Sequence, residues 1–437
     1  MQFIEFPRMD VKVEGMENIR IPKMVRVRQH FDAQRIEDIP AWIRQQMDEK
    51  IADHEGFVGK RICITAGSRG IPHLDVIIKT VIEVLKSWGA EPFIIPAMGS
   101  HGGGTAEGQR EVIEGFGITE EAMGVPILSS MEVVQIGSLP DGTPVCCDKN
   151  AMASDGIVVL NKVKPHTDFR GKHESGLAKM MAIGLAKHAG ASQFHMKGFP
   201  SFAERIPQVC EVFLKHAPVA MGVGIVENAF GELCDIGVCE KEDILDMDAR
   251  LLEEAKARMA KFRLPGIDVL VIDEIGKNIS GNGHDPNITG RSVSTDLPVD
   301  CRIQKIFIRG LNEGTHHNGC GISAADITTR RALNSVDWQM TWVNVVTSTY
   351  TRGGQIPVYT ETDKQAMLLA IRTCVGPRFR FEDVRLVHIR DTKNMDEIEV
   401  SENYLDVIKD DPGIEIISEP FELEFDEEGF LKSNLMQ

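Results

Sequence analysis

The stretch RICITAGSRGIPHLDVIIKTVIEVLKSWGAEPFIIPAMGSHGGGT, residues 61–105, decides the fold class of this chain. It begins with a short apolar run, residues 61–65, that is typical of a buried strand. Residues 73–87 then place apolar side chains three and four positions apart, as on one face of a helix, and Gly89 is suited to end that helix. A second apolar run follows at residues 93–97. This order of strand, helix and strand predicts a parallel sheet with right-handed crossovers.

The same alternation of apolar runs and helical periodicity continues through the chain and indicates two α/β units. A long charged helix ends at Leu264-Pro265-Gly266 and a new apolar strand starts at Asp268, so we place a domain boundary between residues 263 and 264. The tail from Asp396 is acidic, and we expect it to be solvated in part. Further strands are predicted at residues 24–28, 156–160, 219–226, 268–273, 305–308 and 342–346, and further helices at residues 106–116, 177–189, 202–216, 240–262 and 363–373.

Composition and charge exclude several classes of protein. The 437 residues include 48 Lys and Arg against 65 Asp and Glu, a formal net charge of −17, so the chain is a poor partner for nucleic acid or anionic lipid. A small anionic substrate would need a local basic pocket. The nine cysteines are odd in number and lack C-x2-C spacing, which favours reduced thiols over disulfides or a structural zinc site. The N-terminus lacks the pattern of a signal peptide, and no apolar run reaches about 18 residues, so we expect a cytoplasmic protein without a membrane partner.

Three loops at the carboxyl ends of predicted strands hold residues that could carry chemistry, because functional groups of parallel sheets collect there. Arg69 follows the first strand. His101 lies in the glycine-rich loop at residues 99–105, whose backbone could approach a phosphate or carboxylate, although the G-x-G-x-x-G fingerprint is absent. His166 lies in the loop at residues 162–173, which holds two histidines and four basic residues. An anionic ligand or simple solvation of a surface loop would each account for that charge.

Other candidates leave their alternatives open. Lys179 lies among apolar neighbours, where a lysine either has a lowered pKa and acts as a nucleophile or extends its amine to solvent. His195, past the predicted helix, is either a ligand or a satisfied core residue. In the second unit we consider an oxygen-rich metal site at Asp273-Glu274 with His284 and Asp285, a soft-metal site at His316-His317-x2-Cys320, and a fork for a substrate carboxylate at Arg330-Arg331.

Taken in order, these residues resemble a known family. The chain contains, in order, Ser68-Arg69-Gly70-Ile71-Pro72, Gly99-Ser100-His101, Pro165-His166, Lys179 and, sixteen residues later, His195. This ordered set resembles the motifs of the nickel-pincer-nucleotide lactate racemase family. The resemblance covers most of the first domain. It implies an α/β protein of two domains with Rossmann-like parallel sheets and an active site in the cleft between them. Residues 1–263 would form the cofactor-binding and catalytic domain, and residues 264–437 would close the substrate cleft.

The resemblance also implies roles for five residues. Lys179 would hold a nickel-carrying pyridinium-3,5-bisthiocarboxylic acid mononucleotide through a thioamide, and His195 would supply the fourth nickel ligand. His101 and His166 would alternate as acid and base, while Arg69 would orient the substrate. The implied activity is racemisation or epimerisation of a small anionic 2-hydroxy acid by hydride transfer to and from this cofactor. Such a protein would also depend on cofactor-synthesis proteins.

The sequence departs from the family pattern on the substrate side. Ala66 stands where we align an acidic residue, and thirteen residues separate His166 from Lys179, more than we expect for the lactate enzyme. The second-domain Gln and Lys that contact substrate in the family have no clear match, and residues 328–331 occupy that region. We therefore expect a different 2-hydroxy acid, larger or more polar than lactate.

Two other classes of function stay open. One is a nicotinamide- or metal-dependent enzyme that acts on a small anionic substrate through the same loops, although the missing dinucleotide fingerprint argues against the nicotinamide version. The other is a non-catalytic protein that binds a small anion through Arg69, Lys162 and Lys164.

Overall fold

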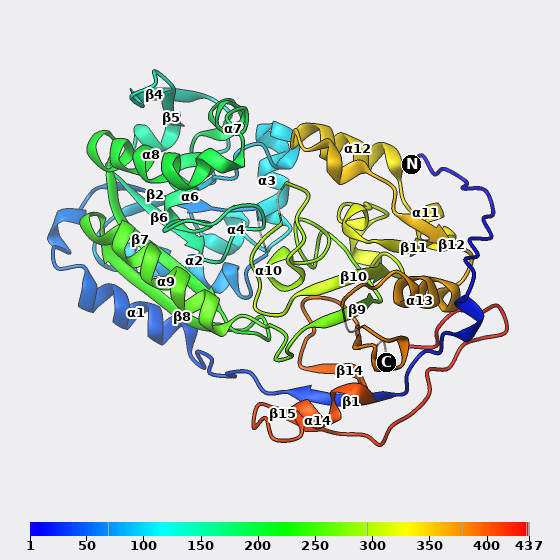
Figure 1. Ribbon diagram of the computed structural model, residues 1–437. Coiled ribbons are helices and arrows are strands. Elements are labelled where there is room, and N and C mark those ends of the chain that lie inside the picture. Colours follow the sequence, from blue (N-terminus) through cyan, green and yellow to red (C-terminus); the bar gives the residue numbers. More distant parts are fainter. Residues whose placement is uncertain (69, 295, 378, 434, 436–437) are drawn as a thin grey trace. The chain divides into compact units, whose positions relative to one another are not determined.

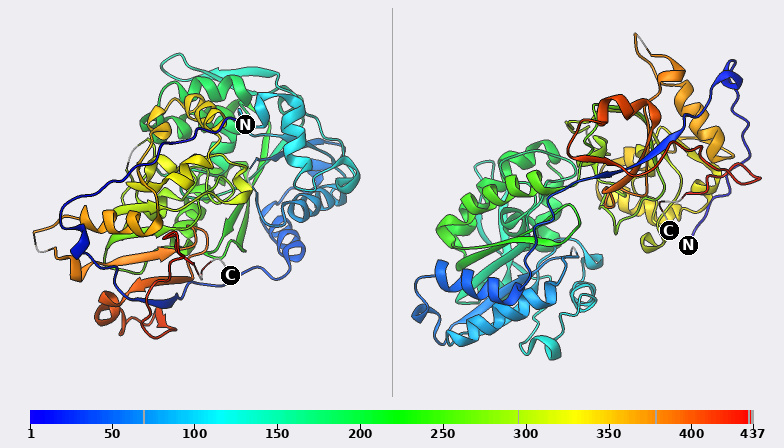
Figure 2. Two further views of the ribbon diagram at one scale, coloured as in Figure 1. Left: turned by 90° about the vertical axis from the view of Figure 1, so that its right-hand side faces the viewer. Right: turned by 90° about the horizontal axis from the view of Figure 1, so that it is seen from below.

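Strand β1 (Met24–Gln29), near the N-terminus, pairs with two strands from the opposite end of the chain. It runs antiparallel to β14 (Glu397–Ser401) and β15 (Ile414–Ile416), and Figures 1 and 2 show this blue strand beside the orange and red ones. The chain divides into two units, residues 33–259 and residues 1–32 with 260–437. The first 32 residues, assigned to the N-terminal domain from sequence, thus lie with the C-terminal unit, because their hydrogen-bonding partners come from the far end of the chain.

The computed structural model describes residues 1–68, 70–294, 296–377, 379–433 and 435, and for His195 the backbone alone. None of the helices in these ranges combines the length and the apolar character that crossing a bilayer requires. None of the nine cysteines, all of which lie in the described ranges, forms a disulfide. The free thiols agree with the reduced cysteines predicted from the sequence.

A five-stranded sheet forms the centre of the unit of residues 33–259. Its strand order is β3-β2-β6-β7-β8, in which the first four strands are parallel and β8 is antiparallel to β7. The predicted α/β class is confirmed, while the antiparallel edge strand and a separate two-stranded hairpin, β4 and β5, were not predicted. The strands are β2 (Arg61–Ala66), β3 (Glu91–Pro96), β4 (Val133–Ser138), β5 (Pro144–Asp148), β6 (Gly156–Lys162), β7 (Val219–Glu227) and β8 (Leu233–Glu240).

Nine α-helical segments of the described chain accompany this sheet. The predicted helix at residues 202–216 is confirmed, whereas the one predicted at residues 177–189 is interrupted by a π-helical turn, η4 (Met180–Gly184). The helices are α1 (Ile39–Lys50), α2 (Leu74–Ser87), α3 (Ala106–Glu114), α4 (Glu120–Met123), α5 (Lys149–Met152), α6 (Leu177–Lys179), α7 (Lys187–His195), α8 (Phe202–His216) and α9 (Ile244–Arg258).

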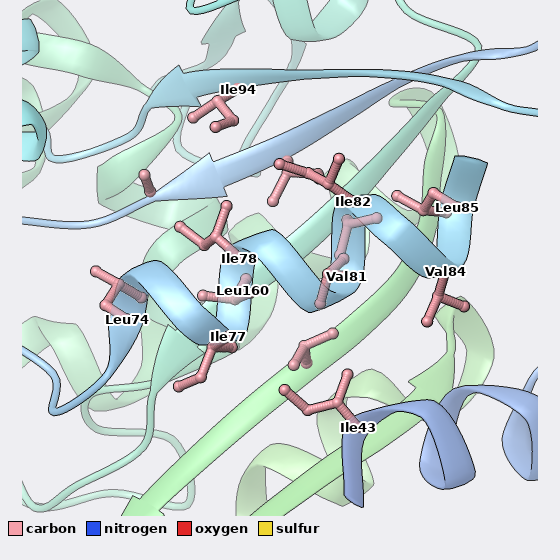
Figure 3. Packing of buried hydrophobic residues seen from close by; sticks show 14 of the residues in the cluster. Ile43, Leu74, Ile77, Ile78, Val81, Ile82, Val84, Leu85, Ile94 and Leu160 are labelled. Carbon is pink, nitrogen blue, oxygen red and sulfur yellow. The ribbon is translucent and has the colours of Figure 1, made fainter. Parts of the chain in front are cut away.

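Helix α2 packs an apolar face against the sheet. Its residues Ile77, Ile78 and Val81 are fully buried, and Figure 3 shows them near Leu160 of β6, with Ile43 of α1 approaching α2. Burial of a side chain of this size contributes about 1.5–3 kcal/mol. This packing therefore holds the strands, and the loops that leave them, in fixed relative positions.

The unit of residues 1–32 and 260–437 contains an eight-stranded mixed sheet. The order is β12-β11-β10-β9-β13-β14-β1-β15, parallel from β12 to β13 and antiparallel beyond. The α/β class is thus confirmed here too. The remaining elements are β9 (Ile267–Ile272), β10 (Ile303–Ile308), β11 (Ile327–Thr329), β12 (Val358–Thr360), β13 (Leu386–Ile389), α10 (Pro286–Thr289), α11 (Arg330–Asn334), α12 (Trp338–Thr347), α13 (Asp363–Arg372) and α14 (Leu405–Ile408).

The strand predicted at residues 342–346 is wrong, because this segment lies in helix α12. Asp337 caps the helix with its side chain, and Trp338 and Val345 are buried. Their spacing of seven residues places them two turns apart on one helix face. The β-branched and aromatic composition that favoured a strand is outweighed by this cap and by the burial.

Strand β14 lies in the acidic tail that was expected to be partly solvated, and it is buried. Ile398 and Val400 are fully buried, and Glu399 between them accepts from Nδ1 of His388, 2.7 Å away. On the other side of the ring, Nε2 of His388 lies 2.8 Å from the carboxylate of Asp273. The tail therefore supplies one carboxylate of a buried ionic network.

This network predicts a pH-dependent stability. Burial alone would lower the pKa of His388, but the carboxylates of Asp273 and Glu399 outweigh it and raise that pKa from 6.5 to about 9. A pKa raised by folding contributes stability that is fully present below the unfolded value and is lost as the pH rises through the folded value. We expect the free energy of unfolding to fall by up to about 3 kcal/mol as the pH rises from about 6.5 to 9, measured by urea unfolding.

The His388→Gln variant should be less stable than the wild type near pH 6 and should lack this slope. The exposed His216 gives the control, since His216→Gln should keep it. A His388→Gln variant whose stability follows the wild-type pH profile would contradict the expectation.

Candidate active site

Loops at the carboxyl edge of the five-stranded sheet contact one another. Since β3, β2 and β6 are parallel neighbours, the loops that follow them leave the same edge. The hydroxyl of Ser68, after β2, is hydrogen-bonded to Nδ1 of His101, after β3. Lys162, at the end of β6, donates from Nζ to the carbonyl of Gly70 at 3.3 Å. The structure thus joins the His101 loop to the loop of Arg69, although Arg69 itself lies outside the described residues.

The loop after His101 requires glycine. Residues 102–104 have φ angles of 64°, 66° and 67°, a region that favours glycine. A Cβ at Gly102 would lie 2.6 Å from the backbone nitrogen of Gln109, so a side chain cannot fit between this loop and α3. Thr105 then caps α3 with its hydroxyl. The base of the loop is therefore tightly packed, while His101 itself is exposed.

His166 is held by its own loop and is 7% exposed. Its backbone N–H donates to Glu174 at 2.8 Å, and its carbonyl accepts from Arg170 at 2.8 Å. The backbone N–H of Asp168 donates to Nδ1 of the ring at 3.0 Å. Because Nδ1 accepts this hydrogen bond, the neutral ring carries its proton on Nε2.

An aromatic cluster connects His166 with the end of helix α7. The ring of His166 lies 5.7 Å from that of Phe199, which lies 5.0 Å from Phe202, and Phe202 lies 4.7 Å from Phe194. Phe194 directly precedes His195, the last residue of α7. The helix thus extends further than predicted and includes His195, whose side chain lies outside the described part of the chain.

Two basic side chains of the loop at residues 162–173 are paired with carboxylates. Lys162 lies 2.7 Å from Glu227, and Arg170 lies 3.6 Å from Glu174, whose side chain is fully buried. The loop is therefore neither simply solvated nor an uncompensated cationic surface. Its charges serve in part to fix its conformation.

Asp248 of α9 determines where the Lys179 helix begins. Its Oδ1 accepts from the backbone N–H of Leu177 at 2.6 Å, and its Oδ2 lies 2.9 Å from Nδ1 of His173. Asp248 is 1% exposed, and the partly exposed Lys179 sits two residues after Leu177. A single buried carboxylate thus ties the 162–173 loop to the helix that carries the lysine.

Sequence reasoning did not single out Glu174 or Asp248. Glu174 directly follows the basic loop, which gives no signal of burial. Asp248 lies four residues after the buried Ile244 and three before the buried Leu251, so it occupies the apolar face of α9. An aspartate on the apolar face of a helix indicates a buried carboxylate with a specific partner, and this signal could have identified Asp248 from the sequence.

The candidates of the second unit are engaged elsewhere. No three of the described His, Cys, Asp and Glu side chains form a group that could hold a metal ion. Asp273 is bound by Arg309 and His388. His284 is hydrogen-bonded through Nδ1 to Thr289 at 3.1 Å, and burial lowers its pKa to about 4. The proposed oxygen-rich metal site is therefore not assembled among the described residues.

The arginine pair and His317 of this unit also have partners. Arg330 lies 3.1 Å from Glu361, and Arg331 lies 3.3 Å from Asp363, so both guanidinium groups are paired with carboxylates. His317 lies 3.0 Å through Nδ1 from the carbonyl of Ser335. These contacts account for the three side chains within the unit.

Removal of the buried carboxylate of Asp248 should destabilise the unit of residues 33–259. We expect Asp248→Ala to lower the free energy of unfolding by about 3–5 kcal/mol, because it leaves His173 and a helix N-terminus without their buried partner. Asp246, on the same helix, is the matched control, since its side chain is 86% exposed. Asp246→Ala should change the stability by less than about 0.5 kcal/mol. Equal effects of the two substitutions in urea unfolding would disprove the positioning role.

Comparisons with known proteins find one family model and a similar solved structure. Residues 19–205 match the sequence model of the family described as lactate racemase N-terminal domain. A search of solved structures finds similarity to the lactate racemase apoprotein from Thermoanaerobacterium thermosaccharolyticum, with 14% identity, a TM-score of 0.42, and coverage of 84% of this chain and 85% of that chain. A search of the curated proteins finds no match.

Proposed function

We propose that this chain, whose residues 19–205 match the lactate racemase N-terminal domain, is a racemase or epimerase of a 2-hydroxy acid that uses a nickel-pincer nucleotide. The observation that carries this proposal is the shared edge of β2, β3 and β6. The loops after these strands bear Arg69, His101 and His166, and all three residues lie within the matched range 19–205.

The residues available fit such a cofactor by their chemistry. Lys179 lies in α6 and is partly exposed, so its amine can be reached by a ligand. An accessible lysine amine can serve as the nucleophile for a covalent attachment. His195 ends α7 and offers an imidazole, a donor that suits nickel beside sulfur ligands. We therefore assign Lys179 to the thioamide link and His195 to the nickel.

When bound, this cofactor supplies a reversible acceptor for the hydride of the substrate C2 carbon. The chain's own residues handle the proton of the hydroxyl group. The hydroxyl of Ser68 can accept from Nδ1–H of His101, which leaves Nε2 of His101 as a base. His166 presents Nε2–H in its neutral form. As the acid it would act from the imidazolium form, which gives one proton to the oxygen of the keto acid and returns to a neutral ring. The two imidazoles exchange these roles in the reverse direction, and Arg69 orients the substrate.

The substrate side of the proposal is a small anionic 2-hydroxy acid other than lactate. Ala66 removes the acidic side chain that the family pattern places three residues before Arg69. Loss of an acidic group near the substrate would favour a more polar or more highly charged acid. The protein would act in the cytoplasm and would depend on cofactor-synthesis proteins to build the nucleotide.

Loading of the cofactor gives the first test. Protein coexpressed with the cofactor-synthesis proteins should carry a mass increment localised to Lys179 and about one nickel per chain, as the covalent attachment of one cofactor to that amine requires. Lys179→Ala should abolish the increment, whereas Lys172→Ala, which removes a lysine whose side chain is 67% exposed, should not. His195→Ala should weaken nickel retention and leave the organic adduct possible. No increment and no nickel in the wild type would favour a metal-dependent enzyme or an anion-binding protein.

The division of roles between cofactor and acid–base residues gives the second test. His101→Ala and His166→Ala should keep the mass increment and lower the turnover of the 2-hydroxy acid by about 10²–10⁴-fold, because each removes one proton-transfer group. His216→Ala, at the exposed end of α8, is the control. Turnover is followed by chiral chromatography on a panel of 2-hydroxy acids. Loss of the cofactor from His166→Ala would show that this residue has a different role, and racemisation of lactate alone would disprove the altered substrate.

A further inference from the structure

A fully buried lysine, Lys187, takes no part in the proposed chemistry. It is the first residue of α7, and both its side chain and that of its ion-pair partner Asp148 are 0% exposed, with Nζ 3.1 Å from the carboxylate. Nζ also donates to the carbonyl of Pro96, the last residue of β3, and to Oε1 of Gln109 at 3.2 Å. Three acceptors from three different elements thus surround one ammonium group.

The contact with Lys187 fixes the orientation of the Gln109 amide. Gln109 is fully buried in α3. Because its Oε1 accepts from Lys187, its Nε2 is the end that faces the glycine-rich loop. Nε2 donates to the carbonyl of Gly99 at 2.8 Å and to the carbonyl of His101 at 3.2 Å. A reversed amide would place oxygen against both carbonyls.

The backbone of Lys187 gives a second, independent observation. Its φ of 54° lies in a region that is uncommon for residues with a side chain and favours glycine. Glycine would adopt this conformation without strain, but it would supply no ammonium group. The burial also argues against a role as a nucleophile, since the amine is enclosed and engaged with Pro96, Gln109 and Asp148.

We propose that Lys187 and Gln109 are positioning residues for His101. Lys187 orients the amide of Gln109, and that amide holds the carbonyls of Gly99 and His101, so the imidazole leaves the loop at a fixed point. Lys187 also starts the helix that ends at His195. The inference rests on the proposed function, because it assumes that His101 transfers a proton.

The sharpest variant is Gln109→Glu. A carboxylate keeps an acceptor for Lys187 but removes both hydrogen bonds to the loop carbonyls. Lys187→Met alone would leave Asp148 as an unpaired buried charge and could prevent folding. The double variant Lys187→Met/Asp148→Asn removes both charges together and therefore serves as the second test. Gln135→Glu is the matched control, because Gln135 donates from Nε2 to the carbonyl of Gly137 at 3.1 Å but is exposed in the β4–β5 hairpin.

The first readout is the ring of His101 in protein without cofactor. Protein labelled with ¹⁵N-histidine gives ring nitrogen resonances that report the tautomer, and the His101 signal is assigned by its loss in His101→Ala. We expect this signal to shift and broaden in Gln109→Glu and in the double variant, and to stay unchanged in Gln135→Glu. An unchanged His101 signal in both test variants would overturn the proposal.

The second readout is turnover of the loaded enzyme. Displacement of an acid–base group by about 1 Å can reduce the rate by about 10²-fold. We therefore expect kcat to fall about 10²-fold in Gln109→Glu, with KM changed less than about threefold and the Lys179 mass increment retained. If the substitution only reduced the yield of folded protein, kcat per loaded site would stay at the wild-type value. That result would also overturn the proposal.

The two readouts separate failure of this inference from failure of the proposed function. If the His101 signal moves but the wild type neither loads cofactor nor racemises a 2-hydroxy acid, Lys187 and Gln109 position the loop and the proposed function is wrong. If the wild type racemises its substrate while the variants keep both kcat and the His101 signal, the positioning role is wrong and the function stands.

Discussion

Parallel pairing of β3, β2 and β6 is the constraint on which the candidate site depends. Backbone hydrogen bonds align the three strands so that their carboxyl ends share one edge of the sheet. The apolar face of α2 stabilises this pairing by burial. Residues more than 60 positions apart in sequence, such as Ser68 and His101 on one side and His166 on the other, thereby leave the same edge.

Buried charged residues then hold the loops at this edge in position. Asp248 holds the start of the Lys179 helix, Glu174 holds the backbone of His166, and Lys187 holds the base of the His101 loop through Gln109. None of these groups is proposed to touch substrate. A buried charge that loses its partner is strongly destabilising, so each of these pairs resists displacement of the loop it holds. The cost of burying these charges is offset by the ion pairs and hydrogen bonds that they form, and the same contacts fix the loops.

Local periodicity correctly predicted those helices and strands that are determined by residues close to them in the sequence. Residues 61–105 formed the expected strand, helix and strand because one apolar face and one cap decide each element locally. The segment 342–346 was misassigned because its aromatic and β-branched residues favour a strand, while the cap at Asp337 and burial against the rest of its unit make it a helix. Strand β1 looked like part of the N-terminal domain because no local pattern shows which strand it will pair with.

The sequence by itself determined the α/β class, the loops that carry His101 and His166, and the order of residues that points to the lactate racemase family. It could do so because turn chemistry, helical spacing and motif order are local properties of the chain. Only the tertiary structure decided which charges of residues 162–173 are paired, that Nδ1 of His166 accepts a hydrogen bond, and that Asp248 and Lys187 are buried beside the site. Those facts depend on groups brought together from β3, α3, β5 and α9, and the spacing of residues along the chain carries no record of such contacts.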